Sequence, residues 1–484
     1  MLDFAIFAFT AVVGLIIILV LLLPDKKDAK ANEWRSQTKY NPHGIPGAPK
    51  SDEKLGNLGD VAQSGSLHQY LLNLHERCGS IAAFWWQNTL VVSLASPDLF
   101  RQTSRLFDRP VDLFLLFEPL IGKMSIQYAN DEDGRERRRN YDVSFSHEAV
   151  NDMMDVFNKL VEEKIVEWEK IPRSEHIPIH KEMVDLAIKA IVMTSFGDFF
   201  NDDSEVDKLR MMYNVVWSEM EMRLDGSMPE EGSARMKRFE EGRQWIKDLV
   251  HRVVEHRQQS SAPFSKLVFI DNLMSLGVLD EQFVCDSISY MIGGFHTSGN
   301  QITWALYYLA TNQDVQDKVH AEVVDALGAG GRVTPENAGK FSYLKQVLNE
   351  TLRASVLAPY AARYATEDTI LNGYTIPKGT PMFHALGVVL QDKELYPDPT
   401  RFDPDRFSPD NVKSRPNFAF EPFGFAGKRK CPGYRFASTE GIVFLARLIQ
   451  RFRVCLPPGQ IVEPVHGLVT SPKDEIWITL ENRL

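Results

Sequence analysis

A single cysteine in a glycine-rich turn constrains this chain more than any other feature. Cys431 lies four residues after Gly427 and two before Gly433, so the backbone there can turn tightly and approach a ligand closely. Arg429 and its lysine neighbours favour the ionised sulfur, which is the form that binds metal. The helix-like run 434–449 should stabilise negative charge through its N-terminal N–H groups. One thiolate ligand of this kind suits haem iron.

Three further features argue against the plainer interpretation, which is a buried free cysteine. Glu350 and Arg353 stand at helical i, i+3 spacing. Arg406 follows in the segment 402–407, and Gly-Gly-Phe-His-Thr-Ser occupies 293–298 inside a long apolar stretch. Taken in this order with the cysteine loop, these features resemble the cytochrome P450 superfamily along essentially the whole chain.

Within that superfamily the chain is most similar to the orphan family twenty of animal cytochromes P450, through residues 1–8, 66–68 and 385–392. The resemblance implies a mainly α fold with small β-sheets (α+β), preceded by one N-terminal transmembrane helix. It implies a haem b cofactor and a monooxygenase that uses dioxygen to oxygenate a lipophilic small molecule. Electrons would come from an NADPH-cytochrome P450 reductase-type donor. Sterols, fatty acids, retinoids and xenobiotics all stay open as substrates.

The resemblance also implies how the haem is held. Cys431 would be the axial ligand of the iron, in a loop shaped by Gly427 and Gly433. Arg429 and Arg363 match positions in the family that bind the two haem propionates.

A third propionate partner should come from the basic run 134–141, which lacks the tryptophan usual in the family. Alignment to the phenylalanine that follows favours Arg138. Arg137 and Arg139 compete with it, and at least two arginines of this run should simply face solvent.

The oxygen-activating site departs from the family, which usually has an acidic residue before the threonine of its long helix. Here His296 precedes Thr297, which keeps the hydroxyl that assists oxygen activation. His296 could relay protons, because histidine titrates near neutral pH, or it could turn toward a polar neighbour and take no part. Direct ligation of the iron is a third alternative. Glycines at 293 and 294 cost the helix roughly 1 kcal/mol each, and close approach of oxygen to the backbone would explain them.

The residue at 296 leaves two other functions open. One is a haem-thiolate isomerase or dehydratase, which rearranges a peroxide and needs neither dioxygen nor a reductase. The other is a haem-binding sensor or scaffold without turnover.

Glu350, Arg353 and Arg406 should form a buried structural triad, with the carboxylate held between two forked guanidinium groups. The alternative is an exposed helix pair of Glu350 and Arg353, worth about 0.3–0.5 kcal/mol, but the apolar residues around them favour burial. Family positions also place five apolar residues at the substrate pocket: Phe114, Phe295, Leu357, Ala358 and Leu468.

The cysteine loop has two departures of its own. The family usually has phenylalanine seven residues before the cysteine, whereas here Gly424 stands between Phe423 and Phe425. A one-residue bulge could restore the packing. Pro432 has no N–H, so one possible hydrogen bond to the sulfur is absent, which could shift the redox potential.

Length, charge and cysteine count limit the remaining possibilities. The 484 residues show no linker or repeat after residue 50, so we expect one catalytic domain over 51–484. A net charge of −11 argues against nucleic acid as a partner. Four irregularly spaced cysteines suggest neither a disulfide framework nor a zinc site, which fits a cytosol-facing domain.

The N-terminus carries a membrane signal. Residues 4–23 are uncharged and long enough to span a bilayer, within an anchor over 1–30. Basic residues follow the span, so the positive-inside rule predicts a single-pass protein, in the endoplasmic reticulum, whose catalytic domain faces the cytosol. A proline-containing hinge over 31–50 joins the anchor to this domain.

Periodicity predicts the main elements of the catalytic domain. We expect a helix over 66–77, two strands over 81–94 and a long loop over 108–130 that could cap a pocket. The segment 147–254 should be mostly helical. Residues 280–326 should form two helices, of which the first is nearly uncharged and therefore buried on all sides.

Overall fold

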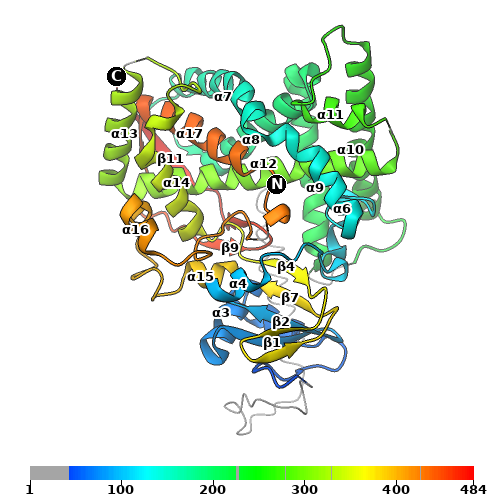
Figure 1. The fold of residues 1–484 in the computed structure, drawn as a ribbon. Helices are drawn as coiled ribbons and strands as arrows, with labels where there is room; N and C mark the ends of the chain where they lie inside the picture. The colour runs from blue at the N-terminus through cyan, green and yellow to red at the C-terminus, as the bar shows by residue number, and fades with distance from the viewer. Residues whose placement is uncertain (1–42, 225–227, 278, 329, 426, 484) are drawn as a thin grey trace.

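One long helix, α12 (Glu281–Thr311), crosses the middle of the molecule (Figure 1). Asp280 caps its N-terminus by accepting a hydrogen bond from the N–H of Phe283, and Asn312 caps its C-terminus. Most of its side chains are buried, as the scarcity of charge predicts. The computed structural model describes residues 43–224, 228–277, 279–328, 330–425 and 427–483.

The predicted membrane span 4–23 and anchor 1–30 lie outside the described residues, as does most of the hinge 31–50. Among the residues that the structure describes, no helix is both long enough and apolar enough to cross a membrane.

Helix α8 (Ile179–Ser195) packs along α12, and two glycines of α12 permit the close approach. A Cβ at Gly294 would lie 2.5 Å from Cγ1 of Ile191, and one at Gly299 would lie 2.8 Å from Cα of Val184. Close packing against α8 therefore gives Gly294 a structural reason of its own, beside the approach of oxygen suggested by the sequence.

Helices cover α12 on several sides and make the fold mainly α, as predicted (Figure 1). The segment 147–254 holds three of them and most of a fourth: α7 (His147–Trp168), α8, α9 (Asp203–Leu224) and α10 (Ala234–Gln259). The other helices are α2 (Leu58–Gln63), α3 (Leu67–Cys78), α4 (Pro97–Thr103), α5 (Glu118–Ile121), α6 (Asp131–Tyr141), α11 (Phe269–Ser275), α13 (Gln313–Leu327), α14 (Ser342–Ser355), α15 (Leu386–Leu390), α16 (Pro409–Ser414) and α17 (Tyr434–Arg451). Helix α17 lies between α7 and α14 and also contacts α12.

A four-stranded sheet forms a separate lobe, with strand order β1-β2-β7-β4 (Figure 1). Its strands are β1 (Ile81–Trp86), β2 (Thr89–Leu94), β7 (Pro381–His384) and β4 (Ala361–Tyr364). β1 and β2 form the predicted hairpin, and its turn places Gln87 at a φ of 54°. β2 pairs with β7 in parallel, whereas β7 and β4 are antiparallel.

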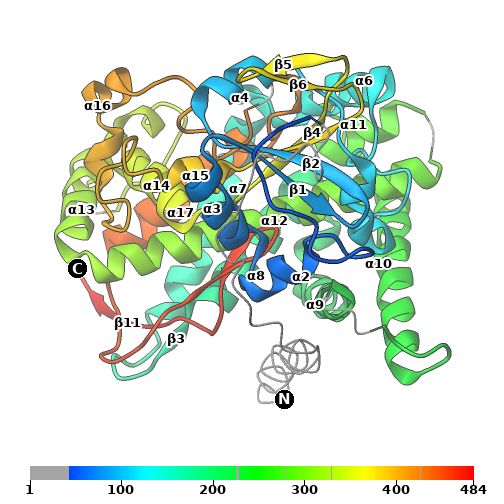
Figure 2. The same cartoon turned by 90° about the horizontal axis from the view of Figure 1, so that it is seen from below.

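The remaining strands of the described residues form small sheets, of which the one over 369–376 lies beside the four-stranded sheet (Figure 2). They are β3 (Ile177–Pro178), β11 (Trp477–Asn482) and β8 (Phe452–Cys455) in one sheet, β5 (Thr369–Leu371) with β6 (Tyr374–Ile376), and β9 (Pro464–His466) with β10 (Thr470–Pro472). The predicted loop over 108–130 is mostly irregular, with short 3₁₀ turns and α5 within it. The predicted α+β composition and its main elements are therefore confirmed.

Candidate functional site

Cys431 lies directly before α17, at the end of a tight loop. The 3₁₀ turn Gly427–Arg429 precedes it, with Gly427 at a φ of 25°. The N–H of Cys431 donates to the carbonyl of Phe423 over 2.9 Å, which closes the loop. Gly433 follows at the start of α17, where a Cβ would lie 4.0 Å from the sulfur. The loop therefore presents the sulfur to an open space instead of packing it into the core.

The cavity that the thiol faces lies inside the protein, so desolvation raises the pKa of the Cys431 thiol, and three groups act against this effect. They are the backbone N–H of Gly433 and the positive charges of Arg138 and Arg109. The guanidinium of Arg429 is directed instead at the carbonyl of Ile126, 3.2 Å away. The cations that favour the thiolate thus come mainly from distant parts of the chain, contrary to the expectation from the local sequence.

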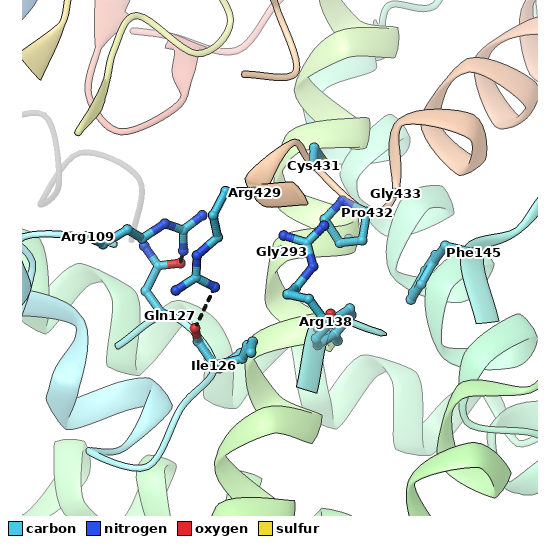
Figure 3. A pocket seen from close by; sticks show the side chains of 13 residues that line it. Arg109, Ile126, Gln127, Arg138, Phe145, Gly293, Arg429, Cys431, Pro432 and Gly433 are labelled. Atoms are coloured by element: carbon cyan, nitrogen blue, oxygen red, sulfur yellow. Dashed lines mark hydrogen bonds between the residues drawn. The ribbon is translucent and has the colours of Figure 1, made fainter. Parts of the chain in front are cut away.

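The open space consists of two cavities of about 160 and 320 Å³, both lined by Cys431, and Figure 3 shows the residues around the smaller one. Four of the five predicted apolar residues line the larger one: Phe114, Leu357, Ala358 and Leu468. Phe295 does not line either cavity. It is fully buried, and its ring packs edge-on against Tyr213 at 4.7 Å. The prediction for Phe295 is wrong because that side of α12 faces α9.

Four arginine side chains converge on these cavities: Arg109, Arg138, Arg363 and Arg429. Figure 3 shows Arg109 beside Arg429, with Arg138 nearer to Pro432. Burial and their mutual repulsion lower the pKa of Arg429 to about 8, of Arg363 to about 9 and of Arg109 to about 10. None of these three forms a salt bridge with a described residue, and Nε of Arg363 has no hydrogen-bond partner. The cluster therefore fits a ligand with two carboxylates, such as haem.

The structure shows which of the three candidate arginines on α6 faces the cavity. Arg138 lines the smaller cavity, where it donates to the carbonyl of Lys430 over 2.7 Å and also pairs with Asp142. Arg137 turns away toward Asp133 and a backbone carbonyl, and Arg139 pairs with Glu132 at the surface.

Arg109 is a site residue that the sequence interpretation missed. It stands in the loop over 108–130, which had been expected to cap a pocket, and its guanidinium donates to the side chain of Gln127. The sequence does place an arginine within a loop that was expected to cap a pocket. No motif with a fixed spacing links this arginine to Cys431, so its place at the site could not be predicted.

Thr297 and Gly293 face the cavity from α12. The hydroxyl of Thr297 donates to the carbonyl of Gly293 over 2.9 Å, which leaves its oxygen as an acceptor. A Cβ at Gly293 would meet nothing within 4 Å, so this glycine widens the cavity beside Cys431. The backbone of the helix is thereby open to a small molecule at this point, as the sequence suggested for both glycines, and Gly294 lines the same cavity.

His296 faces away from the cavity toward α9. Its Nδ1 lies 3.1 Å from the hydroxyl of Tyr213, and its ring packs edge-on against Trp217 at 4.7 Å. Burial lowers its pKa to about 4, so the ring is neutral at pH 7. This geometry favours the alternative in which His296 binds a polar neighbour, over proton relay and over ligation of iron.

Glu350 of α14 is fully buried and held by two arginines. Arg353 makes a bidentate contact with its carboxylate, over 2.7 and 2.8 Å. Nε of Arg406 lies 3.4 Å from Oε1, which also accepts the N–H of Asp403 over 2.9 Å. The structure thus brings together the three residues of the expected triad away from the cavity, but only Arg353 makes the expected forked contact, whereas Arg406 lies at ion-pair distance without a hydrogen bond from its Nε.

The altered residues of the cysteine loop also have a structural role. Gly424 adopts a φ of 83°, a left-handed conformation that a phenylalanine would rarely adopt. The next residue, Phe425, is buried against Phe100 and the ring of His384. A shift of one position therefore keeps an aromatic side chain packed beside the loop.

Comparison with known proteins gives one family along almost the whole chain. A family model described as Cytochrome P450 matches residues 46–479. The protein named Cytochrome P450 20A1 of Homo sapiens is 33% identical over 490 residues, which is 100% of both chains. The protein of the same name from Mus musculus is 33% identical over 484 residues, again 100% of both. Cytochrome P450 4V2 of Rattus norvegicus is 28% identical over 400 residues, 77% of this chain and 76% of its own.

Proposed function

The chain belongs to the cytochrome P450 family, and on that premise we propose that it oxygenates an apolar small molecule in the cavity above Cys431. Membership makes the chain a haem-thiolate monooxygenase, as the resemblance in its sequence implied. Proteins of this family bind haem b through a cysteine thiolate and use a small-molecule substrate, oxygen and a redox partner.

The observation that carries the proposal is that one cavity joins Cys431, Thr297 and a set of apolar side chains. Aromatic and aliphatic residues are among those that line it, including Phe114, Leu357 and Leu468. A cavity of this composition selects a lipophilic molecule, and its few polar groups orient that molecule. Sterols, fatty acids, retinoids and xenobiotics share this chemistry.

Each side chain of the site has a separate task in this proposal. Cys431 would hold the iron, and the four cavity arginines would hold the propionates: Arg109, Arg138, Arg363 and Arg429. When bound, the haem supplies the iron chemistry that activates dioxygen. Thr297 holds a hydroxyl at the cavity wall, where it can pass a proton toward the reacting centre.

The test is reconstitution of the haem-loaded protein with an NADPH-dependent reductase, followed by an untargeted screen of lipid extracts. We expect oxygen uptake that depends on the reductase, and a product that carries one added oxygen atom. Peroxide rearrangement without oxygen uptake would instead indicate an isomerase or dehydratase. The absence of any product or spectral shift over a broad panel would indicate a sensor or scaffold.

The two residues on α12 should respond differently to substitution. Thr297→Ala removes the cavity hydroxyl, so product formed per NADPH should fall by about 100-fold, the lower end of the effect of a positioned proton-transfer group. His296→Ala should leave this ratio unchanged, because the imidazole faces Tyr213 and not the cavity. The measurement is NADPH consumed, peroxide released and product formed.

His296→Asp is the informative control for that pair. If His296→Ala did lower the product formed per NADPH, and His296→Asp restored it, a carboxylate at residue 296 would have to reach the cavity. That result would contradict the position assigned to residue 296. We expect no such recovery, because the side chain at 296 is enclosed by α9.

We further propose that residues 4–23 anchor the protein in the endoplasmic reticulum membrane, with the domain 51–484 facing the cytosol and its reductase. Deletion of residues 1–30 should move most of the protein to the soluble fraction while haem content stays unchanged. Fractionation and the haem absorbance of each fraction measure both. A truncated protein that fails to bind haem would contradict the proposed domain boundary.

A further inference from the structure

Two histidines meet where β9 lies against α3. The ring centroids of His68 on α3 and His466 on β9 are 4.7 Å apart, and the ring planes are inclined at 66°. His68 is 1% exposed, and neither of its ring nitrogens has a hydrogen-bond partner among the described residues. The other buried histidines of these residues, His75 and His384, each have at least one partnered nitrogen. The imidazole of His68 is therefore buried without the hydrogen bonds that normally offset its desolvation.

The surrounding fold is shaped to hold the ring of His68. Gly387 of α15 lies against it, and a Cβ at that position would come within 2.5 Å of Cε1 and 2.7 Å of Nδ1. A larger residue at 387 would therefore displace the imidazole. The side-chain amide of Gln391, four residues later, lies close enough to affect the titration of His68, although no hydrogen bond of ordinary geometry is formed. Two imidazoles and an amide are thus gathered at one place.

Hydrogen bonds around His466 determine which of its ring nitrogens carries the proton. The hydroxyl of Thr470 donates to the carbonyl of Val356 over 2.7 Å, so its oxygen acts as the acceptor in the 3.0 Å contact with Nδ1 of His466. Nδ1 therefore carries the ring proton, and Nε2 keeps its lone pair. Histidines that bind metals are commonly oriented in this way, by a hydrogen bond that the other ring nitrogen donates.

Both imidazoles are neutral at pH 7. Burial, followed by the proximity of His466, lowers the pKa of His68 to about 3, against a smaller opposite effect of Gln391. Burial also lowers the pKa of His466 below its ordinary value. Because neutral imidazole is the form that ligates a metal, neither ring has to lose a proton before an ion binds.

The separation of the two rings indicates which ion fits between them. With Zn–N bonds of about 2.0–2.1 Å, two imidazoles on one tetrahedral zinc ion have their centroids about 5 Å apart, whereas a linear two-coordinate site would separate them by roughly 6 Å. The observed 4.7 Å favours the tetrahedral arrangement. Among the described residues, no third histidine, cysteine or carboxylate completes a metal-binding group here. The amide oxygen of Gln391 and water would therefore fill the remaining positions.

We propose that His68, His466 and Gln391 form a binding site for a zinc ion at the contact between α3 and β9. His466 is partly exposed, so the ion can enter from its side. The site goes beyond the proposed oxygenation, since none of the three residues lines either cavity at Cys431. Leu468, two residues after His466, does line the larger cavity. A bound ion would therefore tie this part of the cavity wall to α3.

The first test is equilibrium dialysis of the haem-loaded protein against Zn²⁺, with Cys431 already occupied by the iron. The wild type should retain a single zinc ion per chain in the presence of excess Mg²⁺, because Mg²⁺ prefers oxygen ligands. His466→Phe keeps an aromatic ring but removes one ligand, and His68→Leu removes the buried one. Each substitution should abolish the retention of zinc. Circular dichroism and haem content show whether each variant is folded.

His256→Phe is the matched control for surface binding. His256 is an exposed histidine whose Nε2 lies 3.0 Å from a carboxylate oxygen of Asp198, so it represents the sites at which zinc binds adventitiously. This variant should retain zinc as the wild type does. The proposal is overturned if the wild type retains no zinc, if folded His466→Phe retains it fully, or if His256→Phe and His466→Phe lose it equally.

Thr470→Val tests the orientation of the second ligand. Valine matches threonine in shape but cannot accept the hydrogen bond from Nδ1 of His466. The affinity for Zn²⁺ should therefore fall by roughly 10- to 100-fold, the usual effect of losing an outer hydrogen-bond partner. An unchanged dissociation constant in the same dialysis would overturn the assignment of Nε2 as the ligand atom.

Hydrogen exchange measures the effect of the ion on the cavity wall. Zn²⁺ should slow amide exchange over 464–472, the segment of β9 and β10, in the wild type but not in His466→Phe. Bound zinc that left exchange in this segment unchanged would overturn the link to the cavity wall. Neither dialysis nor exchange requires turnover, so both results are independent of whether the proposed oxygenation is found.

Discussion

Cys431→Ser should abolish the absorption band that marks thiolate ligation in the reduced, carbon-monoxide-bound protein. The hydroxyl of serine ionises far less readily than a thiol, so it cannot replace the thiolate on iron. The loop itself should survive, because its closing bond joins the backbone N–H at 431 to the carbonyl of Phe423. The difference spectrum of carbon monoxide binding to the dithionite-reduced protein measures the effect.

The matched control is Cys455→Ser. Cys455 is a partly buried free cysteine on β8, and it lines neither cavity. Its substitution should keep the band at full intensity. A thiolate band that persisted in Cys431→Ser would remove the assigned ligand, and with it the cavity as the haem site.

Glu350→Ala should strongly destabilise the fold, because it leaves the buried guanidinium of Arg353 without its anion. Removal of one partner from a buried ion pair typically lowers the free energy of unfolding by about 3–5 kcal/mol. Here the loss also frees the N–H of Asp403 and one contact of Arg406. Urea unfolding followed by circular dichroism, together with the yield of folded protein, measures the effect.

Glu162→Ala provides a matched control for that experiment. Glu162 also pairs with an arginine, Arg447, over 2.6 Å, but its side chain is 53% exposed. Water replaces the lost partner at such a site, so the unfolding midpoint should change little. Equal destabilisation by both substitutions would contradict a special role for burial at Glu350.

Features that depend on residues close together in the sequence could be predicted from the sequence. The glycines around Cys431, the i, i+3 spacing of Glu350 and Arg353, and the apolar run of α12 each specify a local conformation. A turn, a helix face or a buried helix depends on short-range sterics and hydrogen bonding, so a short stretch of consecutive residues is enough to predict it. The order of these motifs along the chain was sufficient to indicate the family, which the comparisons confirm.

The directions in which single side chains of α12 point could not be predicted from the sequence. Successive residues of a helix differ by about 100° around its axis, so His296, Thr297 and Ser298 must point in different directions. The sequence placed all three on one helix but left three alternatives open for His296. The position of α9 favours the one in which the imidazole binds a polar neighbour, since Tyr213 and Trp217 contact its ring, whereas Thr297 and Ser298 line the cavity.

Long-range contacts explain the remaining differences. Arg109 reaches the cavity from a loop more than 300 residues before the cysteine. From the amino-acid sequence alone, the main helices, the first hairpin, the tight loop at Cys431 and the family could be predicted, because these depend on local geometry and on the order of motifs along the chain. The tertiary structure decided which polar groups face the cavity, because the helices and loops that line it come from segments distant in the chain.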